Sequence, residues 1–152
     1  MSNEINRILK LFTEMHHGYC WIGVNFKTAL QGLNAEKAGS RNIENGNSIW
    51  MLVSHIIYWR TTVVNRLEGT LDTPPFRDFT LPEAFTDETW KQSLKDFEST
   101  YHLLIKTIKH FNEKKLQEPS PKNGQTYYDL IMGCLQHDAY HLGQIILLKK
   151  IV

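Results

Sequence analysis

One stretch of the sequence, residues 87–114, restricts the fold more than any other, because its apolar side chains follow a heptad-like repeat. Apolar residues recur there at alternating intervals of four and three: Trp90, Leu94, Phe97, Tyr101, Leu104, Ile108 and Phe111. This spacing places them on one stripe of a helix and is typical of helices that pack in bundles. We therefore predict a long helix from about Asp87 to Lys114 whose stripe needs partner helices.

Three further segments have helical periodicity and supply those partners. The first spans about Asn3–His16 and has one apolar side, formed by Ile5, Ile8, Leu9, Phe12 and Met15. The second spans about Ser48–Leu67 and begins at a serine, which is a favourable N-cap residue. The last spans about Thr126–Ile151, where Thr126 and Asp129 have the spacing of a capping box. Between the first two, shorter helical turns are expected within 26–33 and after Asn34.

The segment 69–86 indicates how the second and third long helices are connected. It contains Pro74, Pro75 and Pro82 and has no helical period. In extended form it reaches up to about 60 Å, twice the roughly 30 Å of a helix of about 20 residues. It can therefore cross the whole bundle and let these two helices run parallel. With no strand pattern or repeat, we predict a single all-α domain, a four-helix bundle over residues 1–152.

Composition excludes several classes of partner. The 17 basic and 16 acidic residues leave a net charge of +1, so there is no electrostatic reason to expect nucleic acid. No apolar run approaches the roughly 18 residues that cross a bilayer, and the first residues lack a signal-peptide core. The two cysteines, Cys20 and Cys134, do not make a disulfide framework. We expect a reduced, soluble, cytoplasmic protein with no membrane partner.

Three histidines fall on apolar helix faces, where an unpaired imidazole is costly to bury. His137 and His141 are four residues apart, so they lie above one another on one face of the last helix. They belong to its interior stripe, and His55 lies at the edge of the apolar face of the second helix. Histidines hydrogen-bonded within the core are one interpretation. A divalent metal ion shared by all three is the other, since it would offset their desolvation.

The surroundings of the pair leave several roles open. His137-Asp138-x-x-His141 is similar to the HExxH helix of zinc proteases, but the shorter Asp138 and the few residues after His141 disfavour that interpretation. Cys134 lies one turn before His137 and could approach a metal, although small buried thiols usually serve packing. Gln144 lies one turn beyond His141 and could donate to a bound group or orient an imidazole.

A second group of candidates follows the first helix. His16 and Trp21 lie in a segment that combines imidazole and aromatic groups where the chain must bend over one end of the bundle. We expect His16, Trp21 and Gln144 to contribute to substrate binding at the mouth of the site. The alternative for the first two is an aromatic-rich loop that simply packs against the bundle.

These features occur in three stretches that resemble a known family. They are HHGYCWIG at 16–23, NSIWMLVSHIIYWRTTVVNRLEG at 47–69 and CLQHDAYHLGQIILLKK at 134–150. The last two, in this order, are similar to the DinB-like, or DinB/YfiT-like, metalloenzymes, and the resemblance extends over essentially the full length. It implies a four-helix bundle of up-down-down-up topology, in agreement with the long crossover between the second and third helices.

The resemblance also implies a cofactor and a set of ligands. The family motif places its metal ligands on one histidine of the second helix and two of the last, here His55, His137 and His141. Family members bind zinc or nickel and often form homodimers. Those with known activity include transferases and isomerases that use low-molecular-weight thiols, so small-molecule thiols and electrophiles are the implied partners.

Three functions fit a tri-histidine metal, which leaves a coordination position open. The first is a metal-dependent S-transferase, because a metal would deprotonate a bound thiol and no protein base would be needed. The second is a hydrolase that uses a metal-bound hydroxide. The third is a non-enzymatic metal-binding protein or sensor. The spacing of the acidic residues, among them Glu14, Glu44 and Asp138, points none of them at the site.

Overall fold

The structure is a computed structural model that describes residues 3–122 and 124–152. Every regular element of these residues is a helix, so the predicted all-α fold is confirmed. The elements in chain order are α1 (Glu4–His16), α2 (Phe26–Leu30), α3 (Ala35–Gly39), α4 (Ile49–Leu67), α5 (Asp87–His110), the 3-10 helix η1 (Glu113–Lys115) and α6 (Tyr127–Lys149).

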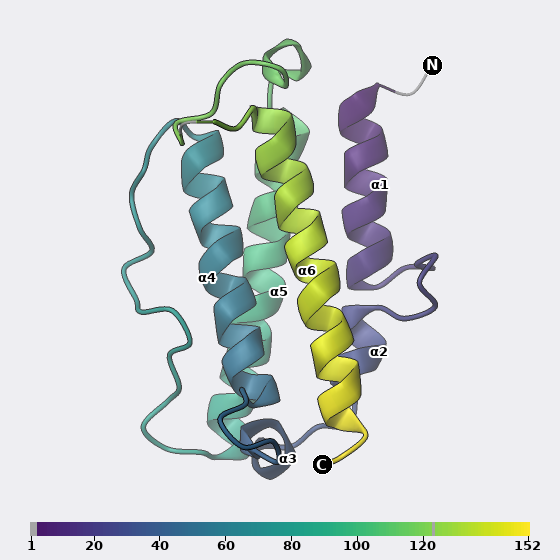
Figure 1. Ribbon diagram of the computed structural model, residues 1–152, viewed down its shortest axis with the longest axis vertical. Helices are drawn as coiled ribbons and strands as arrows, with labels where there is room; N and C mark the ends of the chain where they lie inside the picture. Colours follow the sequence, from purple (N-terminus) through teal and green to yellow (C-terminus); the bar gives the residue numbers. More distant parts are fainter. Residues whose placement is uncertain (1–2, 123) are drawn as a thin grey trace.

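The four long helices α1, α4, α5 and α6 lie side by side, and the short helices α2 and α3 cover one end (Figure 1). The segment between α4 and α5 runs back along the outside of α4, from one end of the bundle to the other (Figure 1). As a result α4 and α5 point in the same direction, while α1 and α6 point in the opposite one. The proline-containing crossover therefore connects the helices as its length predicts.

Side-chain caps explain where the long helices begin. Ser48, Thr86 and Thr126 each precede a helix in extended conformation, and each side-chain oxygen accepts a hydrogen bond from the backbone N–H three residues later. At Thr126 the Asp129 carboxylate returns the interaction by accepting from the Thr126 N–H at 2.9 Å. These bonds satisfy donors that a helix leaves unpaired in its first turn. The predicted capping box at Thr126 is thus present.

The third long helix ends earlier than the sequence pattern predicts. Instead of continuing to Lys114, α5 stops at His110, and Phe111 takes an extended conformation. The ring of Phe111 packs against Tyr127, with centroids 4.8 Å apart, while Asn112 caps the short helix η1. The apolar repeat therefore describes which residues pack toward the core up to Phe111, with Leu94 and Phe111 partly buried, but it does not reveal the local cap that ends the helix.

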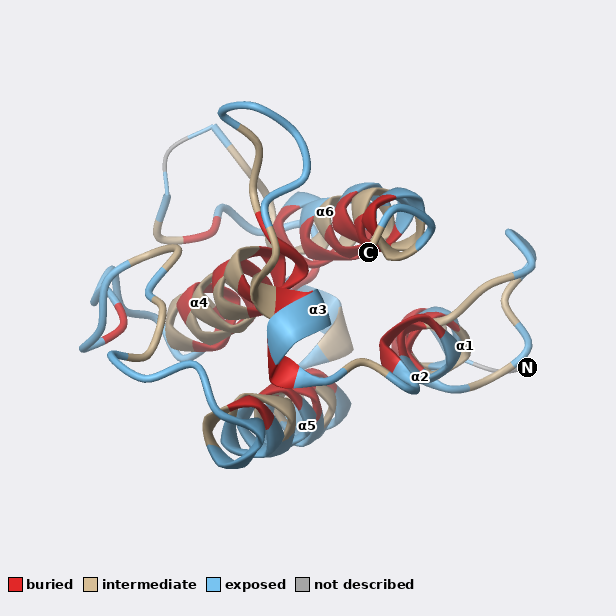
Figure 2. Ribbon diagram, turned by 90° about the horizontal axis from the view of Figure 1, so that it is seen from below, coloured by how far each residue is buried: buried red, intermediate tan, exposed pale blue. Residues whose placement is uncertain are grey.

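Buried residues line the inward faces of the bundle helices (Figure 2). The α5 stripe contributes Trp90, Phe97, Tyr101, Leu104 and Ile108 to this core. Val64, Ile131 and Leu135, which the sequence pattern leaves off the inner stripes, are also buried within the single chain. The wide faces of the bundle helices therefore cover them without a second subunit.

The helices also bear on membrane association. Within the part of the chain that the structure describes, no helix is both long enough and apolar enough to cross a bilayer.

Candidate metal centre

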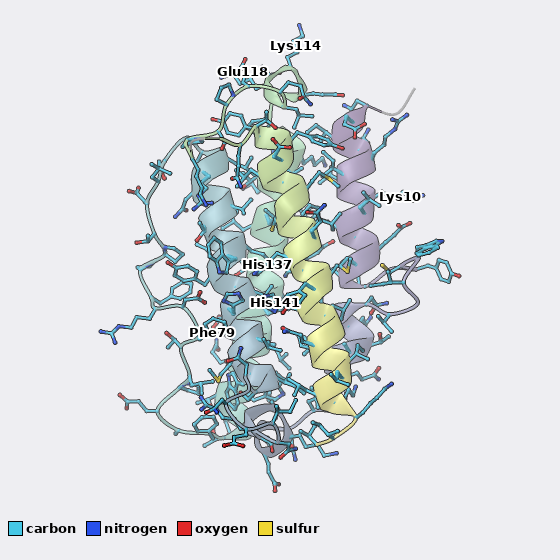
Figure 3. The ribbon with its side chains drawn as sticks, in the orientation of Figure 1. Lys10, Phe79, Lys114, Glu118, His137 and His141 are labelled. Carbon is cyan, nitrogen blue, oxygen red and sulfur yellow. The ribbon has the colours of Figure 1, made fainter. Side chains whose placement is uncertain are left out.

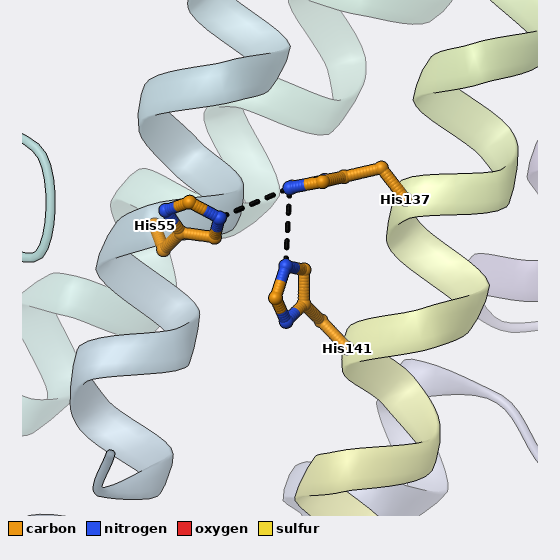
Figure 4. Close-up of side chains that lie close together, drawn as sticks. All are labelled: His55, His137 and His141. Atoms are coloured by element: carbon orange, nitrogen blue, oxygen red, sulfur yellow. Dashed lines mark hydrogen bonds between the residues drawn. The ribbon is translucent and has the colours of Figure 1, made fainter. Parts of the chain in front are cut away.

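Two antiparallel helices bring the three predicted histidines together. His55 comes from α4, and His137 and His141 come from the side of α6 that faces it (Figures 3 and 4). The Nε2 atom of His137 lies 3.0 Å from Nε2 of His55 and 3.1 Å from Nε2 of His141. Each imidazole offers a ligand atom, and these atoms all lie within 4.8 Å of one another. The three histidines are thus close enough to bind one metal ion.

The hydrogen bonds behind the rings fix which nitrogen atoms face the centre. His55 donates from Nδ1 to the Asp78 carboxylate at 2.7 Å, and His141 donates from Nδ1 to the side-chain oxygen of Gln144 at 2.6 Å. In these neutral forms, Nε2 of both rings carries a lone pair directed at His137. A single proton on His137 Nε2 cannot satisfy both lone pairs fully. A cation at the centre would satisfy all three, so the donor set fits a divalent metal.

Burial keeps the imidazoles of His137 and His141 in the neutral form that binds metals. Burial, together with the neighbouring His141 and His55, lowers the pKa of His137 from 6.5 to about 4. Burial likewise lowers the pKa of His141, against the opposing effect of its hydrogen bond with Gln144. Both imidazoles are therefore uncharged at neutral pH and do not have to lose a proton before they can coordinate an ion.

The crossover supplies a partner that sequence reasoning missed. Asp78 accepts from His55 Nδ1 and, through the same oxygen, from the backbone N–H of Phe79 at 2.8 Å. Phe79 has a positive φ of 54°, which is unusual for an aromatic residue. This conformation stacks its ring on His55, with centroids 4.0 Å apart. The two residues hold the His55 imidazole from behind, an arrangement found around metal-ligating histidines.

Asp138, between the two α6 histidines, faces the opposite way. Its Oδ2 atom accepts from Arg60 Nη2 at 2.8 Å and from Arg60 Nε at 3.0 Å, and both side chains are buried. The Arg60 guanidinium also lies over the ring of Phe97, 4.5 Å from its centroid. Asp138 therefore belongs to a buried ion pair in the core. It is not placed to act on a group at the histidines, as the corresponding glutamate of an HExxH helix would be.

A pocket of about 520 Å³ opens beside the three histidines. It is lined by residues from α4, α6 and the loop before α6, among them Trp59, Val63, Arg66, Lys122, Leu130, Cys134 and Tyr140. Burial and the charge of Asp138 raise the pKa of the Cys134 thiol well above its ordinary value. This thiol lines the pocket in its protonated form and is not one of the clustered ligand atoms. The packing interpretation of Cys134 is thus favoured.

The predicted substrate-binding residues have different positions. Gln144 lies behind His141 and orients its ring through the hydrogen bond described above. His16 instead stacks on Tyr101, with centroids 3.6 Å apart, and bonds through Nε2 to Glu98 at 2.8 Å. Trp21 is 94% exposed on a projecting loop. Neither His16 nor Trp21 lines the pocket beside the histidines.

Comparison of the sequence with known proteins identifies the family of the chain. The searches of curated proteins and of solved structures return no match. A family model described as the DinB superfamily matches residues 24–145, which is more than half of the chain and includes all three histidines. The chain therefore belongs to the DinB superfamily.

Proposed function

We propose that this protein binds one divalent metal ion through His55, His137 and His141 and uses it to transfer a low-molecular-weight thiol to an electrophile. The observation that carries the proposal is the convergence of three Nε2 atoms beside an open pocket, where the acidic side chain in the described lining, Asp129, caps α6. Three protein ligands leave a position open on the ion, as in catalytic rather than structural sites.

Each acidic residue that the structure describes around the site bonds to a partner through one carboxylate oxygen. Asp78 is bonded to His55, and Asp138 is paired with Arg60 on the core side of α6. Among the described residues, Asp129 is the one acidic residue that lines the pocket, and its carboxylate caps α6 through Thr126 at 2.7 Å and 2.9 Å. Hydrolysis of an ester or amide normally needs a group that accepts a proton from water. A thiol must lose a proton too, but its free pKa of about 8.5 lies far below the value of about 15.7 for water, so the proton can pass to solvent without a protein base, and this favours thiol transfer.

The ion would serve only to make a bound thiol more acidic. A divalent ion held by His55, His137 and His141 would lower the pKa of a thiol in the pocket, so that the thiol would lose its proton to solvent at neutral pH. The sulfur would then form a bond to the electrophilic carbon, and the leaving group would depart with its electron pair. Gln144 and Asp78 hold two imidazoles in place throughout, and Trp59 and Val63 give the pocket an apolar wall. Imidazole ligands suit both zinc and nickel.

The test is to incubate metal-loaded protein with a chlorodinitroarene and a panel of cellular thiols. Conjugation above the uncatalysed rate should be lost in His141→Ala and retained in His102→Ala, because His102 is an exposed histidine on α5. Ester cleavage without added thiol would instead favour the hydrolase. Metal binding with neither activity would favour a non-catalytic sensor.

We also propose that the protein forms a homodimer in the reduced interior of the cell. The support is the family resemblance, together with apolar side chains such as Leu103 and Leu147 that remain exposed on the single chain. A monomeric mass in light scattering at micromolar concentration would contradict the dimer.

A further inference from the structure

The pocket beside the histidines continues as a groove between α4 and α6. On α4 its wall is formed by His55, Trp59, Val63 and Arg66, at intervals of four, four and three residues along one helix face. On α6 the order runs the other way, from His141 through His137 and Cys134 to Leu130. Eleven residues of α4 separate His55 from Arg66, which corresponds to about 16 Å along the helix axis. The groove is therefore long enough for an extended small molecule.

The chemistry of the wall changes along this length. Between the two ends the wall is apolar, with Val63 contributed by α4 and Leu130 by α6. The far end carries two cations, Arg66 on α4 and Lys122 on the loop before α6. Neither makes an ion pair with any residue that the structure describes. The Arg66 guanidinium lies 5.9 Å from the Trp59 ring centroid, which holds it along the groove wall.

Polar groups without a partner among the described residues also line the groove. The indole Nε1 of Trp59 is buried and has no partner among the described residues. Asp129, the acidic residue of the groove, is already bonded twice to Thr126. The Gln125 side-chain oxygen is unpartnered too, but this amide can turn to present its NH₂ group instead. A ligand that matches this wall must bring negative charge to the end at Arg66 and Lys122.

We propose that Arg66 and Lys122 bind a carboxylate or phosphate at one end of an elongated thiol whose sulfur lies at the three histidines. This inference rests on the proposed thiol transfer and adds a substrate class to it: anionic thiols are preferred over neutral thiols of the same length. The planar guanidinium of Arg66 can bind either anion through two parallel hydrogen bonds. Val63 and Leu130 contact the apolar part of the ligand between the two ends.

The test compares ω-mercaptoalkanoates and ω-mercaptoalkyl phosphonates of increasing chain length with the corresponding neutral ω-mercaptoalkanols. Binding to cobalt-loaded protein is followed by the thiolate-to-cobalt(II) charge-transfer absorption band, a measurement that requires no turnover. Chains long enough to span the groove should bind at least about tenfold more tightly as anions than as alcohols. Short chains should show no such preference. The better of the two anions identifies the natural end group.

Variants separate the anion site from the metal site. Arg66→Gln and Lys122→Gln should each reduce the preference for anionic chains and leave alkanol binding unchanged. Lys95→Gln, the same change of charge at an exposed position on α5, should keep the preference. Equal binding of anions and alcohols by unmodified protein would overturn the anion site while leaving thiol binding intact. Absence of the absorption band with every thiol would overturn the proposed function itself.

Discussion

The contact between Asp78 and His55 makes a sharp prediction about metal affinity. Asp78→Ala removes the carboxylate that accepts from His55 Nδ1 at 2.7 Å. A hydrogen bond to a charged group contributes about 1.5–3 kcal/mol, which corresponds to roughly 10- to 150-fold in a dissociation constant. The Asp78 side chain is 30% exposed, so solvent screening places the effect near the lower limit. We expect zinc to bind about tenfold more weakly, within the range for partners of metal-ligating histidines.

A second variant separates the hydrogen bond from the charge. Asp78→Asn keeps an oxygen that can accept from His55 and from the Phe79 N–H, so its affinity should lie between those of Asp78→Ala and unmodified protein. Affinity is measured by competition with a chromophoric chelator, and thermal unfolding of the metal-free proteins monitors the fold. Asp72→Ala is the control, because Asp72 is an exposed residue of the same crossover and its carboxylate has no partner among the described residues. Unchanged zinc affinity in a folded Asp78→Ala protein would refute the reasoning.

Three further results are expected. The His137→Ala variant should lose most of its bound metal, as measured by elemental analysis. Circular dichroism should show that its helices are intact, because the apolar stripe of α5 still holds the core. Retention of the metal would rule out the triad. Arg60→Met should lower the free energy of unfolding in urea by about 3–5 kcal/mol, because it leaves the buried Asp138 carboxylate without its partner. Adding Asp138→Leu to the same chain should recover much of this loss. Acidification should destabilise the protein between about pH 6.5 and 4. Burial, Arg60 and His17 lower the pKa of His16 to about 4 in the folded protein. Between these pH values the unfolded chain therefore binds a proton that the folded protein does not bind, and this favours unfolding. A chemical-denaturation series across these pH values should show the slope, and His16→Phe should reduce it.

Sequence periodicity placed the long helices and the three histidines on their helix faces, because both depend on a regular spacing. His137 and His141 could be placed on an interior face from the apolar positions around them, and His55 from its distance to Trp59. Asp78 could not be found in this way. It lies in a proline-containing crossover without periodicity, and it reaches His55 only because the crossover passes back along α4.

Helix geometry could have shown from the sequence that Asp138 does not point toward the two histidines. Asp138 follows His137 directly, and adjacent helix residues point about 100° apart, so it could not share the face of the two histidines. Its actual partner, Arg60, lies five residues after His55 and likewise points away from the centre. The pairing of these two residues across α4 and α6 depends on how the helices pack, which the sequence pattern does not specify.

The separation of the ligands along the chain has a kinetic consequence. His55 and His137 are 82 residues apart, and the crossover that carries Asp78 must be in place before the site is complete. Closing so long a loop costs entropy, so we expect the ligands to meet only after α4 and α6 have packed together. On this expectation, bound metal stabilises an arrangement that forms after the folding transition state. It should slow the unfolding of the bundle and leave its refolding rate nearly unchanged, because the ion stabilises a helix pair that has already packed.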